Sequence, residues 1–219
     1  MHFIKHDVWK KTVVSLLNRE IDSCLCSNKQ CNLFLTGGNT AKDLYKEWSS
    51  TSSFKQLNNV NFYLGDERFV SPMSKYSNSR MINESLFSDG IPGNCKFLSI
   101  KTDYKDLSMC ALEYEKILLN QRIDIIIFSM GLDGHIASIF PQSKELKENK
   151  KLVIETESPS FPHHRITITP KLIKKSSFNI LLAIGKEKKI LIEKLSSVDD
   201  NSNEVPVYLI DKSHWYVAY

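Results

Sequence analysis

The stretch that decides the fold reads Ile123-Asp-Ile-Ile-Ile-Phe-Ser-Met-Gly-Leu-Asp-Gly-His-Ile-Ala-Ser-Ile-Phe-Pro141. Its first half is a run of β-branched and aromatic residues, which is typical of a strand buried on both faces of a parallel sheet. Gly131 and Gly134 then indicate a tight turn, and the apolar residues after it predict a short helix over 136–140. Ligands bind at the carboxyl ends of strands in open parallel sheets. The Asp-Gly-His of this turn is therefore predicted to bring a carboxylate and an imidazole to a cleft.

A second strand end lies earlier in the chain, in Cys31-Asn-Leu-Phe-Leu-Thr-Gly-Gly-Asn-Thr40. A short apolar strand runs into a diglycine, and a helix is predicted from there to Trp48, with Asn39 or Thr40 as its N-cap. Glycines at this position let backbone amides approach an anion, and a helix N-terminus adds partial positive charge. The segment has neither the Walker pattern nor a complete Gly-x-Gly-x-x-Gly fingerprint, so nucleotide binding is not favoured.

A third strand end lies in Val60-Asn-Phe-Tyr-Leu-Gly-Asp-Glu-Arg-Phe-Val70. Here the glycine is followed by three charged residues, Asp66, Glu67 and Arg68. Taken alone, such a triplet is typical of a solvated loop. Three buried strands that each end in a polar, chemically capable cluster instead indicate one shared site at the same edge of a sheet.

The order of elements predicts the fold class. Strands and helices alternate, which favours an α/β fold with a mostly parallel, open twisted sheet and helices on both faces. With 219 residues, 42% of them hydrophobic, we expect one domain over residues 1–219. Helices are predicted at 7–27 (with Asp7 as N-cap), 39–48, from 77 or 78 onward, around 107–118 and at 186–196; strands are predicted at 31–36, 60–65, 97–100, 123–130, 151–155, 165–169 and 177–184, with extended pieces at 206–210 and 214–218.

Composition argues against several classes of protein. No run of about 18 apolar residues is present, and the N-terminus lacks an apolar signal-peptide core, so we expect neither a membrane span nor secretion. The five cysteines are scattered, and Cys24-Leu-Cys26 lacks a matching second pair, so zinc is not expected and reduced thiols fit a cytoplasmic protein. A net charge of +4 without a basic patch interleaved with aromatic residues does not favour nucleic-acid binding. The polar segment 196–203 is predicted to be a surface loop.

These motifs, in this order, resemble the 6-phosphogluconolactonases, and the resemblance runs from about Leu33 to Trp215. It is carried by Gly37-Gly-Asn-Thr40, Gly65-Asp-Glu-Arg68, Ser77-Asn78, Gly131-Leu-Asp-Gly-His-Ile-Ala-Ser-Ile-Phe-Pro141, His164-Arg-Ile-Thr-Ile-Thr169 and Gly185-Lys-Glu-Lys188. The resemblance implies a Rossmann-like fold and hydrolysis of 6-phospho-D-glucono-1,5-lactone to 6-phosphogluconate, without a metal or other cofactor. The chain departs from the family pattern at Asn39, Ser129 and Ile136, where serine, glycine and threonine are usual, and in its C-terminal tail.

The resemblance also implies roles for individual residues. His135 would activate water as a general base, Asp133 or Asp66 would orient its imidazole, and Arg68 would stabilise the oxyanion. The substrate and its phosphate would be bound by a further set: Gly37, Gly38, Asn39, Thr40, Asn78, Gly134, Arg165 and Lys188. No serine or cysteine nucleophile is apparent, and Ser138 is predicted to be a helix residue.

Two other functions are compatible with parts of this pattern. Glucosamine-6-phosphate deaminases have a similar fold and share the Ile136-Ala137 pair, but they carry Asp-Glu-Tyr and Phe-Asn-Glu-Pro where this chain has Asp66-Glu-Arg68 and Ser138-Ile-Phe-Pro141. A non-catalytic sugar-phosphate sensor would need an attached DNA-binding helix pair, which the single predicted N-terminal helix does not supply. We therefore expect an enzyme whose partner is a small sugar-phosphate lactone, with no nucleic-acid or membrane partner, acting as a monomer or weak homodimer.

Overall fold

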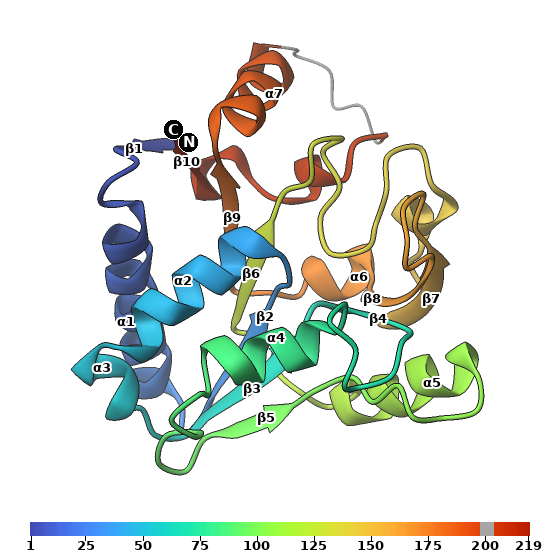
Figure 1. Cartoon of the computed structure of the whole chain (residues 1–219), viewed down its shortest axis with the longest axis horizontal. Coiled ribbons are helices and arrows are strands. Elements are labelled where there is room, and N and C mark those ends of the chain that lie inside the picture. The colour runs from blue at the N-terminus through green and yellow to red at the C-terminus, as the bar shows by residue number, and fades with distance from the viewer. Residues whose placement is uncertain (198–203) are drawn as a thin grey trace.

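The structure, a computed structural model, describes residues 1–197 and 204–219 (Figure 1). Its centre is a seven-stranded sheet with the order β1-β10-β9-β6-β2-β3-β5, in which every neighbouring pair is parallel. The strands are β1 (His2–Ile4), β2 (Cys31–Leu35), β3 (Val60–Leu64), β5 (Lys96–Leu98), β6 (Ile125–Ser129), β9 (Phe178–Ile184) and β10 (Trp215–Ala218). The predicted fold class is confirmed. Most of the predicted loop at 196–203 lies outside the described residues.

The central strands are buried as their composition predicts. Every residue of β2 and of β3 is buried, and so are the first four residues of β6. A strand covered by helices on both faces cannot alternate apolar and polar side chains, which is why these segments read as continuous apolar runs.

Helices connect the parallel strands. The α-helices are α1 (Trp9–Ser27), α2 (Asn39–Ser49), α3 (Ser52–Lys55), α4 (Asn78–Ser85), α5 (Leu107–Leu118), α6 (Pro170–Ile173) and α7 (Lys186–Ser197). Of these, α1, α2 and α4 lie side by side (Figure 1). Parallel crossovers are right-handed, so the connections through α5 and α7, which run along the sheet in the opposite direction, cover its other face. No helix in residues 1–197 and 204–219 is both long enough and apolar enough to cross a membrane.

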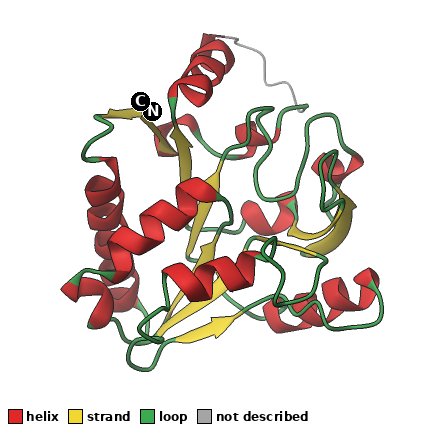
Figure 2. Ribbon diagram, viewed as in Figure 1, coloured by secondary structure: helices red, strands yellow, loops and turns green. Residues whose placement is uncertain are grey.

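A second, smaller sheet lies beside the large one (Figure 2). Its antiparallel strands have the order β4-β8-β7, with β4 at Asp66–Arg68, β8 at His164–Ile168 and β7 at Val153–Glu157. The strands predicted near 151–155 and 165–169 exist, but they belong to this separate sheet, which was not predicted from the sequence. The charged triplet after Gly65 forms the third strand of the same sheet. Cross-strand pairing with β8 gives the triplet its extended conformation.

Other predicted details differ from the structure. Residues 136–140 form a turn with a bridge between Ile136 and Ile139, because Ala137 has a φ of 48°, which a right-handed helix does not allow. Residues 206–209 form a 3-10 helix, like 144–147 and 212–214, and are not extended. The N-cap of α1 is Val8, with no side-chain cap, so Asp7 does not cap this helix.

The topology opens a crevice between β2 and β6. From β2 the chain proceeds to β3 and β5 on one side, and it then returns to β6 on the other side of β2. The loops after β2 and β6 therefore diverge toward opposite faces of the sheet. In doubly wound folds, this switch point is where ligands bind.

Two buried tyrosines fix the strand ends beside this crevice. The Tyr45 hydroxyl, from α2, receives a hydrogen bond from Thr36 N at 2.9 Å and donates to Thr36 O at 2.9 Å. The Tyr114 hydroxyl, from α5, does the same with the N and O of Leu64 at 2.8 and 2.9 Å. At these points the hydrogen bonds between strands stop, and the tyrosine hydroxyls supply partners for the buried backbone N–H and C=O groups.

We expect Tyr45→Phe and Tyr114→Phe each to lower the free energy of unfolding by about 1–3 kcal/mol, because each leaves a buried N–H and C=O without its partner. Tyr104→Phe, at a partly exposed position, serves as the control and should change stability by less than about 0.5 kcal/mol. Denaturant unfolding measures all three. Wild-type stability in both buried variants would show that these hydroxyls do not secure the strand ends.

Candidate active site

A cleft of about 330 Å³ lies at the carboxyl ends of β2 and β6 and extends to the small sheet. This volume suits a small-molecule ligand. Its lining comes from segments far apart in the sequence: Thr36–Thr40, Asp66, Arg68, Asn78, Ser129–Leu132, His135, Ala137, Ser138, Phe140, Ser158, Ser160, Arg165 and Lys188. The three strand ends predicted from the sequence therefore do meet at one site.

One end of the cleft is suited to an anion. The N-cap of α2 is Gly38, not Asn39 or Thr40, and no side chain caps this helix. Its first backbone N–H groups are thus left for a ligand. Lys188 lies in the first turn of α7, and its Nζ is 3.5 Å from Thr40 Oγ1 at the start of α2. Burial lowers the pKa of Lys188, so a bound anion would stabilise its charged form.

Only glycine fits at position 37, because Asn78 occupies the space that a side chain would need. A Cβ on Gly37 would lie 2.1 Å from Asn78 Oδ1, closer than any contact allows. Asn78 Nδ2 in turn donates to the backbone oxygen of Asp66 at 3.0 Å. Asn78 therefore connects the loop after β2 to the beginning of β4, and a larger residue at position 37 would separate them.

The buried carboxylate of Glu67 anchors the N-terminus of α4. It accepts hydrogen bonds from the backbone N–H groups of Arg68, Asn78 and Ser79 at 2.7–2.8 Å, and from the hydroxyl of Ser77 at 3.1 Å. Burial raises the pKa of Glu67, although these donors lower it in part. Glu67 does not line the cleft, and it positions its neighbours, Arg68 and Asn78.

Two guanidinium groups lie next to each other on the small sheet. Arg68 on β4 is directly opposite Arg165 on β8. Arg68 Nη1 donates to Tyr76 O at 2.6 Å, while its Nε–H is buried without a hydrogen-bond partner among the described residues. Burial and then the charge of Arg68 lower the pKa of Arg165, against the opposite effect of nearby Asp66 and Glu67. An anionic ligand would relieve this repulsion.

Asp66 is held by a contact with the turn that follows His135. Ser138 Oγ donates to Asp66 Oδ2 at 2.7 Å, and the N–H of Ser138 donates to Thr167 Oγ1 at 3.1 Å. Ser138 is thus not a helix residue, because both its polar groups bond to the small sheet. These contacts bind the turn after His135 to β4 and β8.

His135 is oriented by Asp133. Its Nδ1 lies 2.5 Å from Asp133 Oδ1, which also accepts the N–H of His135 at 3.1 Å. Burial raises the pKa of Asp133, but the hydrogen bond and charge of His135 outweigh this effect and lower it overall. The imidazole lies against Gly131, where a Cβ would be 2.1 Å from its Cε1, and against Phe140, with ring centroids 4.9 Å apart. Gly131 is therefore needed for this ring position.

The structure brings together most of the predicted site residues. All of them line the cleft except Asp133, which contacts His135, and Gly134, which forms the turn with a φ of 85°. Of the two carboxylates proposed to orient His135, Asp133 is the one that contacts it, and Asp66 contacts Ser138 instead. The lining residues that were not predicted as site residues are Thr36, Ser129–Leu132, Ala137, Ser138, Phe140, Ser158 and Ser160. Serines in loops carry no periodicity or spacing signal that could have identified them.

Known proteins that resemble this chain include 6-phosphogluconolactonases. A 6-phosphogluconolactonase of Borreliella burgdorferi is 35% identical over 161 residues, which are 70% of this chain and 68% of the relative. One from Thermotoga maritima is 29% identical over 226 residues, covering 99% of this chain and 97% of the relative.

Solved structures have the same fold. The crystal structure of a Thermotoga maritima 6-phosphogluconolactonase matches with a TM-score of 0.81 and 27% identity, covering 100% of this chain and 98% of that one. A 6-phosphogluconolactonase from Shewanella baltica matches with a TM-score of 0.85, covering 99% and 96%, and at 23% identity it supports the fold alone. The family model for glucosamine-6-phosphate isomerases and 6-phosphogluconolactonases matches residues 5–218. This chain belongs to that family.

Proposed function

We propose that this protein hydrolyses 6-phospho-D-glucono-1,5-lactone to 6-phosphogluconate, with His135 as the general base and without a cofactor. The observation that carries the proposal is the His135–Asp133 pair, at 2.5 Å, in a cleft that also contains two arginines, a lysine and an uncapped helix N-terminus. A base and an anion-binding surface in one small cleft fit a substrate that joins an ester to a phosphate. The relatives named above support the choice of lactone.

The tautomer of His135 follows from its contact with Asp133. An ionised carboxylate only accepts hydrogen bonds, so the imidazole proton resides on Nδ1. This leaves Nε2 with its lone pair available to take a proton from water. The resulting imidazolium, stabilised by Asp133, can return that proton to the departing ring oxygen.

Arg68 is proposed to stabilise the oxyanion that forms when water attacks the lactone carbonyl. Arg68 lines the cleft, and its charge is permanent. A donor held in place before the reaction costs no reorganisation when negative charge develops, and this is the usual basis of oxyanion stabilisation.

The phosphate is proposed to bind at the N-terminus of α2, between the amides of 37–40 and Lys188, with Arg165 as a further cation. An uncapped N-terminus and an ammonium group converge there through the contact of Lys188 with Thr40. Arg165 lies opposite Arg68, so it could act at the phosphate or at the lactone end. Weaker binding of inorganic phosphate in Arg165→Ala would place it at the phosphate, and unchanged binding would place it at the lactone end.

The main rival is a deaminase that acts on glucosamine 6-phosphate. Such an enzyme needs a further carboxylate for proton shuttling in the segment after the histidine, where this chain has Ser138-Ile-Phe-Pro141. The deciding experiment measures turnover of freshly made 6-phosphogluconolactone, corrected for spontaneous opening, and of glucosamine 6-phosphate. Hydrolysis of the first alone supports the proposal, and ammonia release from the second overturns it.

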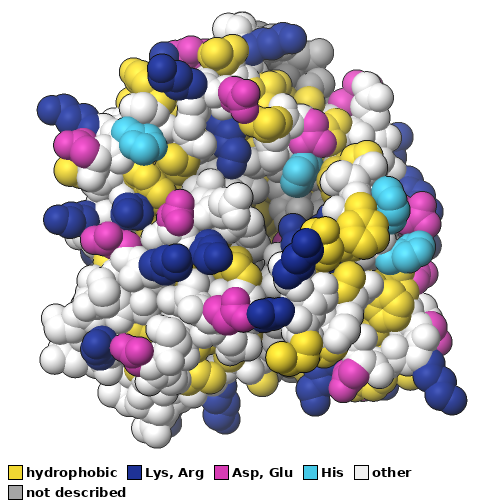
Figure 3. Space-filling model, in the orientation of Figure 1, with side chains coloured by type: hydrophobic (Ala, Val, Ile, Leu, Met, Phe, Trp, Pro, Cys, Tyr) yellow, Lys and Arg dark blue, Asp and Glu magenta, His cyan; other side chains and the backbone are white. Residues whose placement is uncertain are grey.

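The proposal treats residues 1–219 as one catalytic domain of a cytoplasmic protein that acts as a monomer or weak homodimer. Lys and Arg side chains are spread among Asp and Glu side chains over the face shown in Figure 3. This mixed distribution supports a small-molecule substrate in preference to a nucleic acid, which binds to concentrated basic surfaces.

We expect His135→Ala to lower kcat by roughly 10²–10⁴-fold, because water then lacks its general base. Asp133→Asn should also lower kcat, since an amide can donate to Nδ1 and favour the wrong tautomer. His164→Ala, at an exposed position on β8, is the control and should keep wild-type turnover. Background-corrected lactone hydrolysis measures all three, and near wild-type turnover in His135→Ala would rule out this base.

We expect Arg68→Ala to reduce kcat more than it raises KM, because an oxyanion contact strengthens in the transition state. Arg68→Lys keeps the charge, loses the planar fork and should recover only part of the rate. Steady-state kinetics of both variants test this. A changed melting temperature with unchanged kcat would make Arg68 a structural residue.

We expect Lys188→Ala to weaken 6-phosphogluconate binding by about 1.5–3 kcal/mol through loss of a charge-assisted contact. Because burial lowers the pKa of Lys188 and a bound anion raises it, wild-type affinity should fall as pH rises, beginning below the ordinary lysine pKa of about 10.4. Calorimetry across alkaline pH measures this. A decline that is equally steep in Lys188→Ala would assign it to another group.

A further inference from the structure

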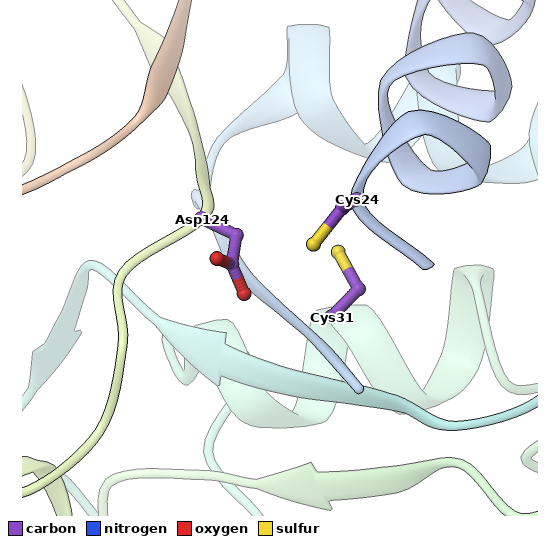
Figure 4. A group of neighbouring side chains, drawn as sticks. All are labelled: Cys24, Cys31 and Asp124. Atoms are coloured by element: carbon purple, nitrogen blue, oxygen red, sulfur yellow. The ribbon is translucent and has the colours of Figure 1, made fainter. Parts of the chain in front are cut away.

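We propose that Cys24, Cys31 and Asp124 form a binding site for a thiophilic divalent cation, with Zn²⁺ as the probe. The three residues come from the last turn of α1, the first position of β2 and the position before β6. They lie at the amino ends of these strands, at the opposite edge of the sheet from the cleft. Figure 4 shows the two sulfur atoms pointing toward each other and the carboxylate toward them.

The geometry is close to that of a metal site. One ligand atom from each residue lies within 4.8 Å of the others. In tetrahedral zinc sites with Zn–S near 2.3 Å and Zn–O near 2.0 Å, ligand atoms are separated by roughly 3.3–3.8 Å. Side-chain movements of about 1 Å would therefore bring the three ligand atoms to the spacing of a zinc site. Cys24 is only partly buried, which leaves an approach for the cation and room for water as a fourth ligand.

Hydrogen-bond donors around the three residues hold the carboxylate and the Cys24 sulfur in place. Arg122 donates to both Asp124 oxygens, at 2.5 Å and 3.0 Å, and Asn32 N donates to Oδ2 at 2.8 Å. The structure describes one donor to Oδ1, so that oxygen retains a lone pair for a cation. Arg122 Nη2 and Asn28 Nδ2 also approach Cys24 Sγ, at 3.7 and 4.0 Å. Such outer contacts orient ligands and tune metal affinity.

The charges balance when the cation is divalent. Metal binding displaces the two thiol protons to solvent, so the site then holds two thiolates and one carboxylate. One guanidinium and one divalent cation neutralise these three negative charges. Zinc was not expected from the sequence, because Cys24-Leu-Cys26 has no second pair. The fold instead brings Cys24 next to Cys31 and to Asp124, which is distant in the sequence.

The site's role would be structural, because it joins the end of α1 to β2 and β6 far from the cleft. A cation that binds only the folded state stabilises it by mass action. The inference is independent of the proposed catalytic function, and lactone turnover should not depend on the cation.

The test uses the full chain, reduced and freed of metal with a chelator, and titrated with Zn²⁺ by calorimetry and with Cd²⁺ by thiolate charge-transfer absorption. We expect one thiol-dependent ion per chain, and Zn²⁺ at 100 times its Kd should raise the melting temperature by roughly 5–10 °C. Cys24→Ser, at a partly buried position, should weaken binding at least tenfold while the protein stays folded, and Asp124→Asn should weaken it too.

Cys26→Ser, two positions along the same helix and exposed, is the matched control and should bind like the wild type. His135→Ala should keep the thiolate signal, which separates this site from any binding in the cleft. The proposal is overturned if no saturable binding occurs, if Cys24→Ser binds as tightly as the wild type, or if mass spectrometry shows Cys24 and Cys31 as a disulfide under the reducing conditions of the titration.

Discussion

The position of the site depends on the divergence of the chain on either side of β2. Strands β3 and β5 follow on one side and β6 and β9 on the other, so two crossover loops leave the middle of the sheet toward opposite faces. The gap between them cannot be filled by either crossover, and loop residues and charged side chains line it. The uncapped start of α2 and the His135 turn face each other there because both follow neighbouring strands of one parallel sheet.

A shell of buried polar contacts makes this crevice rigid. Tyr45 holds the backbone of Thr36, just after β2, and Tyr114 holds that of Leu64, the last residue of β3, so the loops that follow begin at fixed points. Glu67 binds the start of α4 to β4, and Ser138 binds the histidine turn to the small sheet through Asp66. Each of these groups is buried, so losing one partner would leave an unsatisfied group at a cost of about 1–3 kcal/mol. Such a shell preorganises the charged side chains that face the cleft.

The sequence was sufficient to predict the parallel sheet, because continuous apolar runs and alternating helices report burial directly. It also placed His135 and Arg68 at one edge of the sheet, and the family resemblance added Lys188. It was not sufficient for the small sheet, since β4 has only three residues and owes its conformation to pairing with a distant strand. The turn at Ala137 has apolar spacing that favours a helix, yet contacts with Asp66 and Thr167 override it. The orientation of His135 by Asp133 depended on distances that no spacing reveals.

We propose that the crevice holds the lactone at His135 and the phosphate at the N-terminus of α2. A crystal structure of the protein with bound 6-phosphogluconate would decide this. We expect the phosphate among the amides of 37–40 with Lys188 at hydrogen-bond distance, and the product's new carboxylate beside His135 Nε2 and Arg68. A phosphate bound at His135 with the carboxylate at α2, or a product bound outside the cleft, would contradict it.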